Sequence, residues 1–375
     1  MIALRAPRLF DGRHEHEEAV LLIDGGRIAG IAAEVPPGVP EEDLPEDTIL
    51  APGYIDLQVN GGGGIMFNDE TTPDGLARIA AAHARTGTTA ILPTLISTDR
   101  PHMARAIVAA RAAIEAGVPG IIGLHLEGPF LNPIRRGAHP ASAITPMSEA
   151  DASMLAAPFP APLLATIAPE MTTPARIAAL VQAGVIVFAG HSDATYEQAH
   201  EAFAAGTTGA THLYNAMSQL LHRAPGLLGA VLDDPRAMAG IIADGHHVHP
   251  ASLRIALNAL GPERLFLVSD AMATAASDIT TFTLAGGAIT LNDGMLTNTD
   301  GTLAGAHLTM AEAVRNIVTF TGIDWTLAVQ MATATPAAAL GLEDRGVIAI
   351  GAHADLVVLD DDLNVLEVWQ GGRRI

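Results

Sequence analysis

The stretch GLHLEGPF, residues Gly123–Phe130, carries the pattern on which the rest of the chain is organised. The apolar run before Glu127 predicts a buried strand, and the Gly-Pro pair after it is typical of a turn. A charge at the mouth of a buried strand needs a partner. Because His191 and His212 also end apolar runs, we expect Glu127, His191 and His212 to bind one metal ion.

The composition of the 375-residue chain favours a large core and limits the available chemistry. Hydrophobic residues make up 49% and charged residues 16%. A formal net charge of -21 argues against nucleic acid or an anionic membrane as a partner. The sequence has no cysteine and no lysine, which excludes disulfides, thiolate ligands and a carboxylated-lysine metal bridge. With no signal-peptide core and no membrane-spanning run, we expect a soluble cytoplasmic protein.

Alternating buried strands and alanine-rich helices between residues 51 and 344 predict an α/β fold, a (β/α)8 TIM barrel. The expected strands are Tyr54–Val59, Thr89–Leu95, Ile121–Leu126, Leu163–Ala168, Val185–Ala189, Gly209–Leu213, Met238–Ala243 and Leu265–Ser269. The clearest expected helices are Pro73–Arg85, Pro101–Ala116, Pro174–Gln182, Tyr196–Ala205 and Pro250–Leu260. A hairpin insertion at Ile279–Gly305 and two final helices, Leu308–Phe320 and Trp325–Gly341, complete this part.

The two ends of the chain have a different pattern, of short strands and turns. Ala19–Ile23 and Arg27–Ile31 flank Asp24-Gly25-Gly26, a strong hairpin signal. Near the C-terminus we expect strands at Val347–Ile350, Leu356–Leu359 and Val365–Trp369. Neither end has enough apolar surface to fold alone. We therefore expect residues 1–50 and 345–375 to form one small composite β-sandwich domain beside a catalytic barrel domain of residues 51–344.

In such a barrel the active site lies at the carboxyl ends of the strands. Polar residues follow the expected strands in turn: Gln58 and Asn60, Thr94, Glu127, Glu170, His191, His212, Asp244 and Asp270. One carboxylate and two imidazoles suit zinc or ferrous iron. A single strand-end histidine is more often structural, but three matched ligands reverse that expectation. Asp270 would act beside the metal as general base and then general acid; a further ligand or a helix N-cap is the alternative.

The roles of other polar features remain open between alternatives. His139, in the loop after Glu127, could polarise a carbonyl group or hold an oxyanion, or it could simply be solvated. Arg223 could bind phosphate together with a histidine, or be a surface charge. Residues Asp244–His249 contain three histidines in four positions, which cannot all have one role. The run Gly61–Gly64 could cradle an anion or form a tight turn.

Six segments of the sequence resemble the N-acetylglucosamine-6-phosphate deacetylases, a branch of the amidohydrolase superfamily. They are PGYIDLQVNGGGG at Pro52–Gly64, HLEGPF at His125–Phe130, GHSDAT at Gly190–Thr195, THLYNAM at Thr211–Met217, ADGHHVH at Ala243–His249 and VSDAM at Val268–Met272. The resemblance covers essentially the whole chain, including GVIAIGAHADLVVLD near its end. It implies a metal-dependent barrel with a composite β-sandwich, usually a homodimer.

The resemblance also implies an activity, hydrolysis of the acetamide of N-acetylglucosamine 6-phosphate to glucosamine 6-phosphate and acetate. It implies that Glu127, His191 and His212 are metal ligands. Asp270 would be the acid/base, and His139 would polarise the acetyl carbonyl. The implied substrate-binding residues are Asn215 and Ala216 for the sugar or phosphate, and His247 and Arg223 for the phosphate, with Arg223 from its own or the partner subunit.

Many superfamily relatives hold two metals through two histidines after the first strand. Here those positions are Gln58 and Asn60, which are poor ligands beside imidazole. We therefore expect one divalent ion per subunit; zinc is favoured, and iron, cobalt and manganese are the alternatives. Rival functions are deacetylation of another sugar such as N-acetylgalactosamine 6-phosphate, hydrolysis of a cyclic amide, and a non-catalytic sugar-phosphate sensor. The intact Asp270 argues against the sensor.

Overall fold

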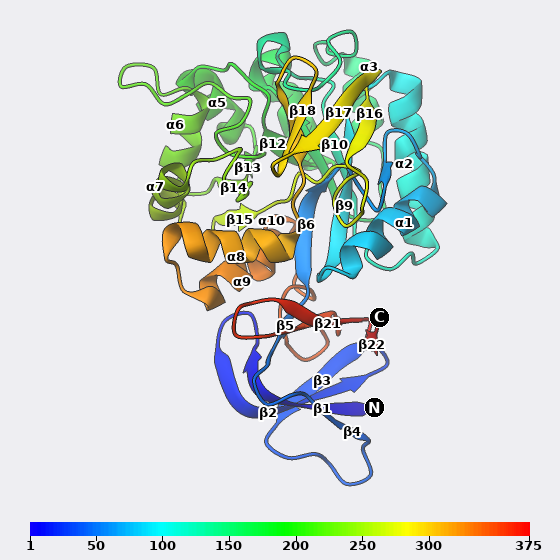
Figure 1. Cartoon of the computed structure of the whole chain (residues 1–375). Coiled ribbons are helices and arrows are strands. Elements are labelled where there is room, and N and C mark those ends of the chain that lie inside the picture. Colours follow the sequence, from blue (N-terminus) through cyan, green and yellow to red (C-terminus); the bar gives the residue numbers. More distant parts are fainter.

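A barrel of eight parallel strands forms the centre of the molecule in the computed structural model, which describes all 375 residues (Figure 1). Its strands are β6 (Tyr54–Val59), β9 (Thr88–Ile96), β10 (Leu124–Glu127), β11 (Leu163–Ile167), β12 (Ile186–Ala189), β13 (Gly209–Ala210), β14 (Met238–Ile241) and β15 (Leu265–Leu267). Neighbours in the chain are neighbours in the sheet. A parallel bridge between Val59 and Ala271 joins the chain after β15 back to β6. The expected (β/α)8 barrel is confirmed.

Helices surround the barrel, as expected for parallel strands joined by crossovers (Figure 1). They are α1 (Pro73–Ala84), α2 (Arg100–Glu115), α3 (Glu149–Leu155), α4 (Pro174–Gln182), α5 (Tyr196–Ala204), α6 (Gly226–Asp233), α7 (Pro250–Leu260), α8 (Met310–Thr321), α9 (Trp325–Ala332) and α10 (Ala334–Ala339). Local sequence sets several starts: the Thr72 and Asp99 side chains accept the first free N–H groups of α1 and α2, with proline following. The expected final helix is divided at Thr333, whose φ of -133° is not helical. No helix has the length and apolar character that crossing a membrane would require.

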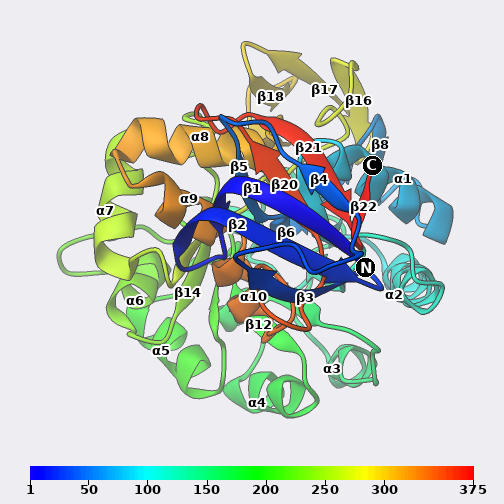
Figure 2. The ribbon, with the colours of Figure 1, turned by 90° about the horizontal axis from the view of Figure 1, so that it is seen from below.

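The two ends of the chain form the β-sandwich as one hydrogen-bonded sheet, below the barrel in Figure 1 and in front of it in Figure 2. Its strands are β1 (Ile2–Phe10), β2 (Glu15–Asp24), β3 (Arg27–Ala32), β4 (Glu41–Asp43), β5 (Ile49–Pro52), β20 (Leu356–Leu359), β21 (Val365–Gln370) and β22 (Arg373–Arg374). β5 pairs with β20, which joins the N-terminal strands to the C-terminal ones. The hairpin turn is confirmed: Gly25 and Gly26 have φ of 56° and 80°, the signs that a type I′ turn requires.

The expected strand Val347–Ile350 is absent. This segment lies between Gly346 and Gly351, both with positive φ, and makes no ladder with another strand. Its apolar character has a different cause, because Ile348 is buried in the sandwich core and its N–H donates to the carbonyl oxygen of Asp11. The run therefore supplies one buried side chain to the core without forming a strand, and Ile350 at its end is 81% exposed.

The expected hairpin insertion is a four-stranded antiparallel sheet at the end of the barrel opposite the sandwich (Figure 1). Its strands are β16 (Thr281–Leu284), β17 (Gly287–Asn292), β18 (Met295–Asn298) and β19 (Leu303–Ala306). It packs on Met66, Ile96 and Met272 at the barrel rim. The run Gly61–Gly64 forms the tight turn of a small hairpin, β7 (Gly61–Gly62) with β8 (Ile65–Met66), with φ of 59° and 89° at Gly63 and Gly64.

Candidate active site

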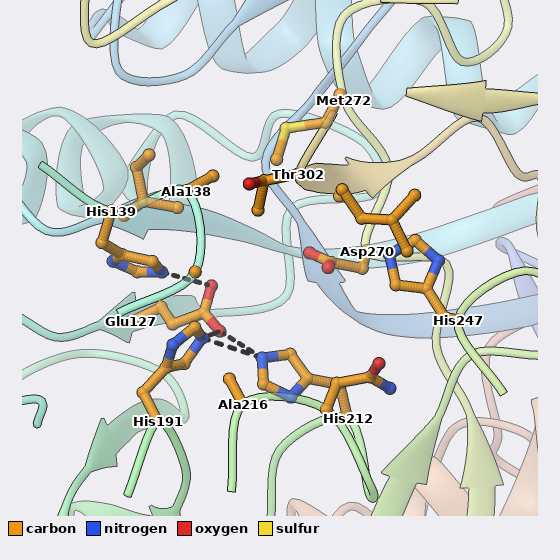
Figure 3. Close-up of a pocket in the computed structure, with 15 residues that line it drawn as sticks. Glu127, Ala138, His139, His191, His212, Ala216, His247, Asp270, Met272 and Thr302 are labelled. Atoms are coloured by element: carbon orange, nitrogen blue, oxygen red, sulfur yellow. Dashed lines mark hydrogen bonds and ion pairs between the residues drawn. The ribbon is translucent and has the colours of Figure 1, made fainter. Parts of the chain in front are cut away.

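Glu127, His191 and His212 meet at the carboxyl end of the barrel (Figure 3). Oε1 of Glu127 lies 3.2 Å from Nε2 of His191 and 3.0 Å from Nε2 of His212, and the two ring nitrogens are 3.0 Å apart. All three residues are at least 95% buried. Both histidines follow short strands in the left-handed region, with φ of 47° and 30°, a conformation unfavourable by roughly 1–2 kcal/mol for residues other than glycine. The structure thus brings the expected trio together.

The three facing atoms fit a cation. Nδ1 of His191 lies 2.8 Å from the carbonyl oxygen of Arg135 and must donate to it, so Nε2 presents a lone pair to Glu127. A carboxylate oxygen and an imidazole lone pair cannot satisfy each other, and a cation between them would. Ligands about 2.1 Å from a tetrahedral zinc lie about 3.4 Å apart, close to the spacing here.

His139 competes with His212 for a place in this cation site. The ligating atoms of Glu127, His139 and His191 lie within 4.8 Å of one another. Nδ1 of His139, however, accepts the N–H of Ser97 at 3.2 Å, and burial followed by the charge of His191 lowers the pKa of His139 to about 3. The neutral ring then carries its proton on Nε2, 3.8 Å from Glu127. His139 therefore presents an N–H group, not a lone pair, toward Glu127. His212 is for this reason the better third ligand of the cation.

The neighbours of Glu127 stabilise the charged form of its carboxyl group. Burial alone would raise the pKa of its carboxyl group, but the adjacent His191 and His212 rings favour the charged form, outweigh burial and hold the pKa well below its usual value. The carboxylate is thus an anion at neutral pH, 2% exposed at the floor of the cavity.

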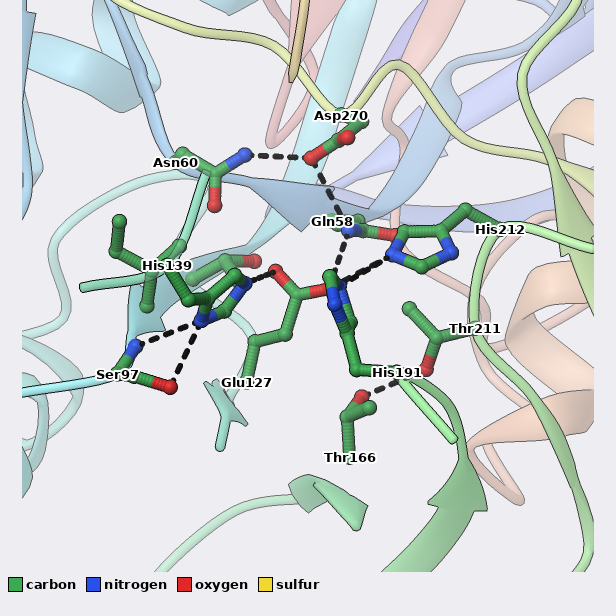
Figure 4. A network of polar contacts seen from close by, with 12 residues as sticks. Gln58, Asn60, Ser97, Glu127, His139, Thr166, His191, Thr211, His212 and Asp270 are labelled. Atoms are coloured by element: carbon green, nitrogen blue, oxygen red, sulfur yellow. Dashed lines mark hydrogen bonds and ion pairs between the residues drawn. The ribbon is translucent and has the colours of Figure 1, made fainter. Parts of the chain in front are cut away.

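Asp270 lies across the cavity from Glu127, three residues after β15 (Figure 4). Its Oδ1 accepts hydrogen bonds from Nδ2 of Asn60 at 2.6 Å and from Nε2 of Gln58 at 3.0 Å. The amide nitrogens must face this oxygen because a carboxylate only accepts. Burial, and then the negative charge of Glu127, raise the pKa of Asp270 to about 6. One oxygen is fixed and the other remains available.

The sequence places Gln58 and Asn60 at the barrel rim and identifies them as poor ligands, but this supporting role was not anticipated. The signal was nonetheless present, because both are amides at the carboxyl end of the first barrel strand, beside the strand-end position of Asp270. Gln58 also donates to Oε1 of Glu127 at 3.1 Å. The two amides thus hold the carboxylates of both sides of the cavity.

The three adjacent histidines have separate places. Nδ1 of His247 lies 2.6 Å from Oδ2 of Asp244, so its other ring nitrogen is free, and the side chain lines the cavity. His249 is the N-cap of α7 and accepts the N–H of Ala251. His246 lies beside Gly294 of the insertion. Of the three, only His247 lines this cavity.

The cavity has a volume of about 240 Å³. Asn215 and Ala216 line it, as do Thr302 and Leu303 of the insertion, which sequence reasoning did not connect with the site. Arg223 is exposed and lies outside the lining residues of its own chain. The structure therefore gathers every expected site residue except Arg223.

Comparison with known proteins assigns the family. The sequence model of the amidohydrolase family matches residues 49–375. The chain belongs to the amidohydrolase family. This amidohydrolase is 42% identical over 375 residues to the N-acetylgalactosamine-6-phosphate deacetylase of Shewanella sp. (strain ANA-3), covering 99% of this chain and 95% of that protein. Members of this metal-dependent family are hydrolases, so the chain is a hydrolytic enzyme.

Two solved structures extend the likeness to the whole fold. The N-acetylglucosamine-6-phosphate deacetylase of Pasteurella multocida has a TM-score of 0.96 at 34% identity and covers 100% of this amidohydrolase and 99% of that chain. A mutant of the Mycobacterium smegmatis N-acetyl-D-glucosamine-6-phosphate deacetylase, in complex with N-acetyl-D-glucosamine-6-phosphate, has a TM-score of 0.92 at 34% identity, with coverage of 100% and 98%.

Proposed function

We propose that this amidohydrolase hydrolyses the acetamide of N-acetyl-D-glucosamine 6-phosphate to D-glucosamine 6-phosphate and acetate. The observation that carries the proposal is the convergence of Glu127, His191 and His212 opposite Asp270 in one cavity. The likeness to enzymes named for this substrate, one of them in complex with it, supports the choice of sugar.

We propose one divalent ion per subunit, bound by Glu127, His191 and His212. Two imidazoles and a carboxylate favour zinc, and iron, cobalt and manganese accept the same donors. Gln58 and Asn60 support a single ion, because both amides donate to carboxylates and offer no ring nitrogen to a second metal. When bound, such an ion polarises a carbonyl oxygen and lowers the pKa of water.

Asp270 is the proposed general base and general acid. Its available oxygen takes a proton from the attacking water while the water oxygen bonds to the acetyl carbon. The same carboxyl group then gives this proton to the sugar nitrogen as the C–N bond breaks, releasing the amine and acetate. A pKa raised to about 6 favours both transfers near neutral pH. His139, with its proton on Nε2, donates to the carbonyl oxygen as negative charge develops there.

The phosphate group is proposed to meet His247, with Asn215 and Ala216 beside the sugar. Arg223 lies outside the cavity of its own chain, so we assign it to the cavity of a partner subunit in a homodimer. Leu220 and Leu221 of the same loop are 52% and 61% exposed, which suits a contact between subunits.

The test is acetate release by the zinc-loaded enzyme from a panel of N-acetyl sugars with and without the 6-phosphate. We expect N-acetylglucosamine 6-phosphate to give the highest kcat/KM. The galactose epimer is a second candidate, because the 42% identical relative is named for it. A higher kcat/KM for that epimer would replace the first proposal, and no acetate release from any member would favour a sensor.

A further inference from the structure

Glu170 joins two loops of the barrel rim without lining the cavity. It follows β11, in the short 3-10 helix Pro169–Met171, and is partly buried. Its Oε1 accepts hydrogen bonds from Nδ2 of Asn132 at 2.9 Å and from the backbone N–H of Asp193 at 2.6 Å. Its Oε2 accepts the hydroxyl of Ser192 at 2.7 Å. One carboxylate thus receives donors from the loop after β10 and from the loop after β12.

His191 belongs to the loop after β12, and the loop after β10 makes hydrogen bonds with both its backbone and its ring. The N–H of Asn132 donates to the carbonyl oxygen of His191 at 2.8 Å. The ring Nδ1 of His191 donates to the carbonyl oxygen of Arg135 in the same loop. Arg135 in turn pairs with the carboxylate of Asp193 at 2.8 Å. The backbone and the ring of His191 are therefore both fixed by the loop that Glu170 ties down.

The backbone of His191 needs this support. Its φ of 47° lies in the left-handed region, which a residue with a Cβ adopts only when its surroundings impose it. The next two residues, Ser192 and Asp193, are the ones that donate to Glu170. Without the carboxylate, the loop after β12 loses two of the hydrogen bonds that hold it, and the direction of the imidazole changes with the backbone.

We propose that Glu170 is a positioning residue that fixes the His191 imidazole for binding the cation. The inference rests on the proposed ligand role of His191. Loss of a group that orients a ligating histidine typically lowers metal affinity about 10–100-fold, and Glu170 acts on both the ring and the backbone of this ligand. Glu170 is not among the residues that line the cavity, so it would not contact a substrate bound there.

The experiment measures zinc affinity of metal-stripped protein by competition with a chromogenic chelator, after circular dichroism has shown that each variant is folded. We expect Glu170→Ala to bind zinc about 10–100-fold more weakly. Glu170→Gln keeps an oxygen for Asn132 and Asp193, and its amide nitrogen can donate to the hydroxyl oxygen of Ser192, so neutral hydrogen bonds replace charged ones and zinc affinity should stay within about threefold of wild type. Glu201→Ala, which removes an exposed carboxylate of α5, is the matched control and should be unchanged.

Two further variants make the result decisive. If His191→Ala loses zinc while Glu170→Ala binds it normally, the positioning role is wrong and the ligand role stands. If His191→Ala binds zinc as wild type does, the ligand role fails first. Should Glu170→Ala not fold, Asn132→Asp sets a like charge against Glu170 while keeping the oxygen that accepts the N–H of Ile134. Weak zinc binding in that variant supports the proposal, and normal binding overturns it.

Discussion

Nδ2 of Asn60 lies 2.6 Å from Oδ1 of Asp270. The two residues are next to Val59 and Ala271, whose parallel bridge joins the end of β6 to the segment after β15. The amide of Asn60 stabilises the charged form of Asp270 and lowers its pKa against the opposing effect of burial. Asn60→Ala should therefore raise the pKa of Asp270, so that the base is protonated over more of the acidic range. The acidic limb of the pH profile of kcat/KM should move to higher pH. A limb that stays in place or moves to lower pH would contradict this account.

Asp270→Asn removes the group that accepts and returns the proton. Acid–base catalysis by one positioned group contributes about 10²–10⁴-fold, so kcat should fall by that factor while the variant keeps its metal and its affinity for substrate. Steady-state kinetics and metal analysis of the same preparation provide the measurement. Near-normal turnover would overturn the assignment.

Glu127→Ala removes the only anionic ligand of the proposed cation site. Metal binding should be lost, because two neutral imidazoles remain. Elemental analysis after dialysis gives the occupancy, and addition of a chelator to the wild-type enzyme should abolish activity that zinc then restores. Full occupancy in the variant would exclude Glu127 from the ligand set.

Asp244→Asn tests the pairing with His247. The carboxylate lies 2.6 Å from Nδ1, so its loss should weaken the hold of His247 on a phosphate group. Charge-assisted hydrogen bonds contribute about 1.5–3 kcal/mol, and KM for the phosphorylated sugar should rise about tenfold or more, with kcat nearly unchanged. The unphosphorylated sugar is the internal control. An equal loss on both sugars would indicate a general disturbance of the cavity instead.

The ion pair of Asp151 with Arg100 predicts a stability change in acid. Burial would raise the pKa of Asp151, but hydrogen bonds from Arg100 and Ser148 outweigh it and lower the pKa to about 2 from 3.8. The folded state therefore gains stability that is complete above about pH 4 and is lost as the pH falls through about 2, about 2 kcal/mol in total. Urea unfolding of Asp151→Asn should show this deficit at pH 7 and little difference near pH 2. A constant deficit would contradict the linkage.

Much of the fold was readable from the sequence because each barrel strand is a short apolar run between turn residues. Even the two-residue strand β13 was expected, within Gly209–Leu213. The failures have two causes. An apolar run need not pair as a strand: of Val347–Ile350 only Ile348 is buried, and the segment makes no ladder. Trp325–Gly341 is interrupted at Thr333, three residues before Pro336, and a proline within a predicted helix is a local signal of a break.

The residues of the candidate site, too, include some that the sequence predicted and some whose role it did not show. The strand-end rule brought Glu127, His191, His212 and Asp270 together, since parallel strands deliver their ends to one rim. Residue type alone does not give the direction in which a side chain donates. The amides of Gln58 and Asn60 and the carboxylate of Glu170 were therefore visible as polar residues but not as supports.

The position of β5 between β1 and β20 also has a consequence for biosynthesis. A ribosome releases the first fifty residues long before the strand that pairs with β5 has been translated. Until Leu356–Leu359 emerges, the nascent chain carries an open sheet edge, and the order of translation makes its closure one of the final steps of assembly. A transcript cut short by twenty codons would leave that edge permanently open, and we expect the product to aggregate.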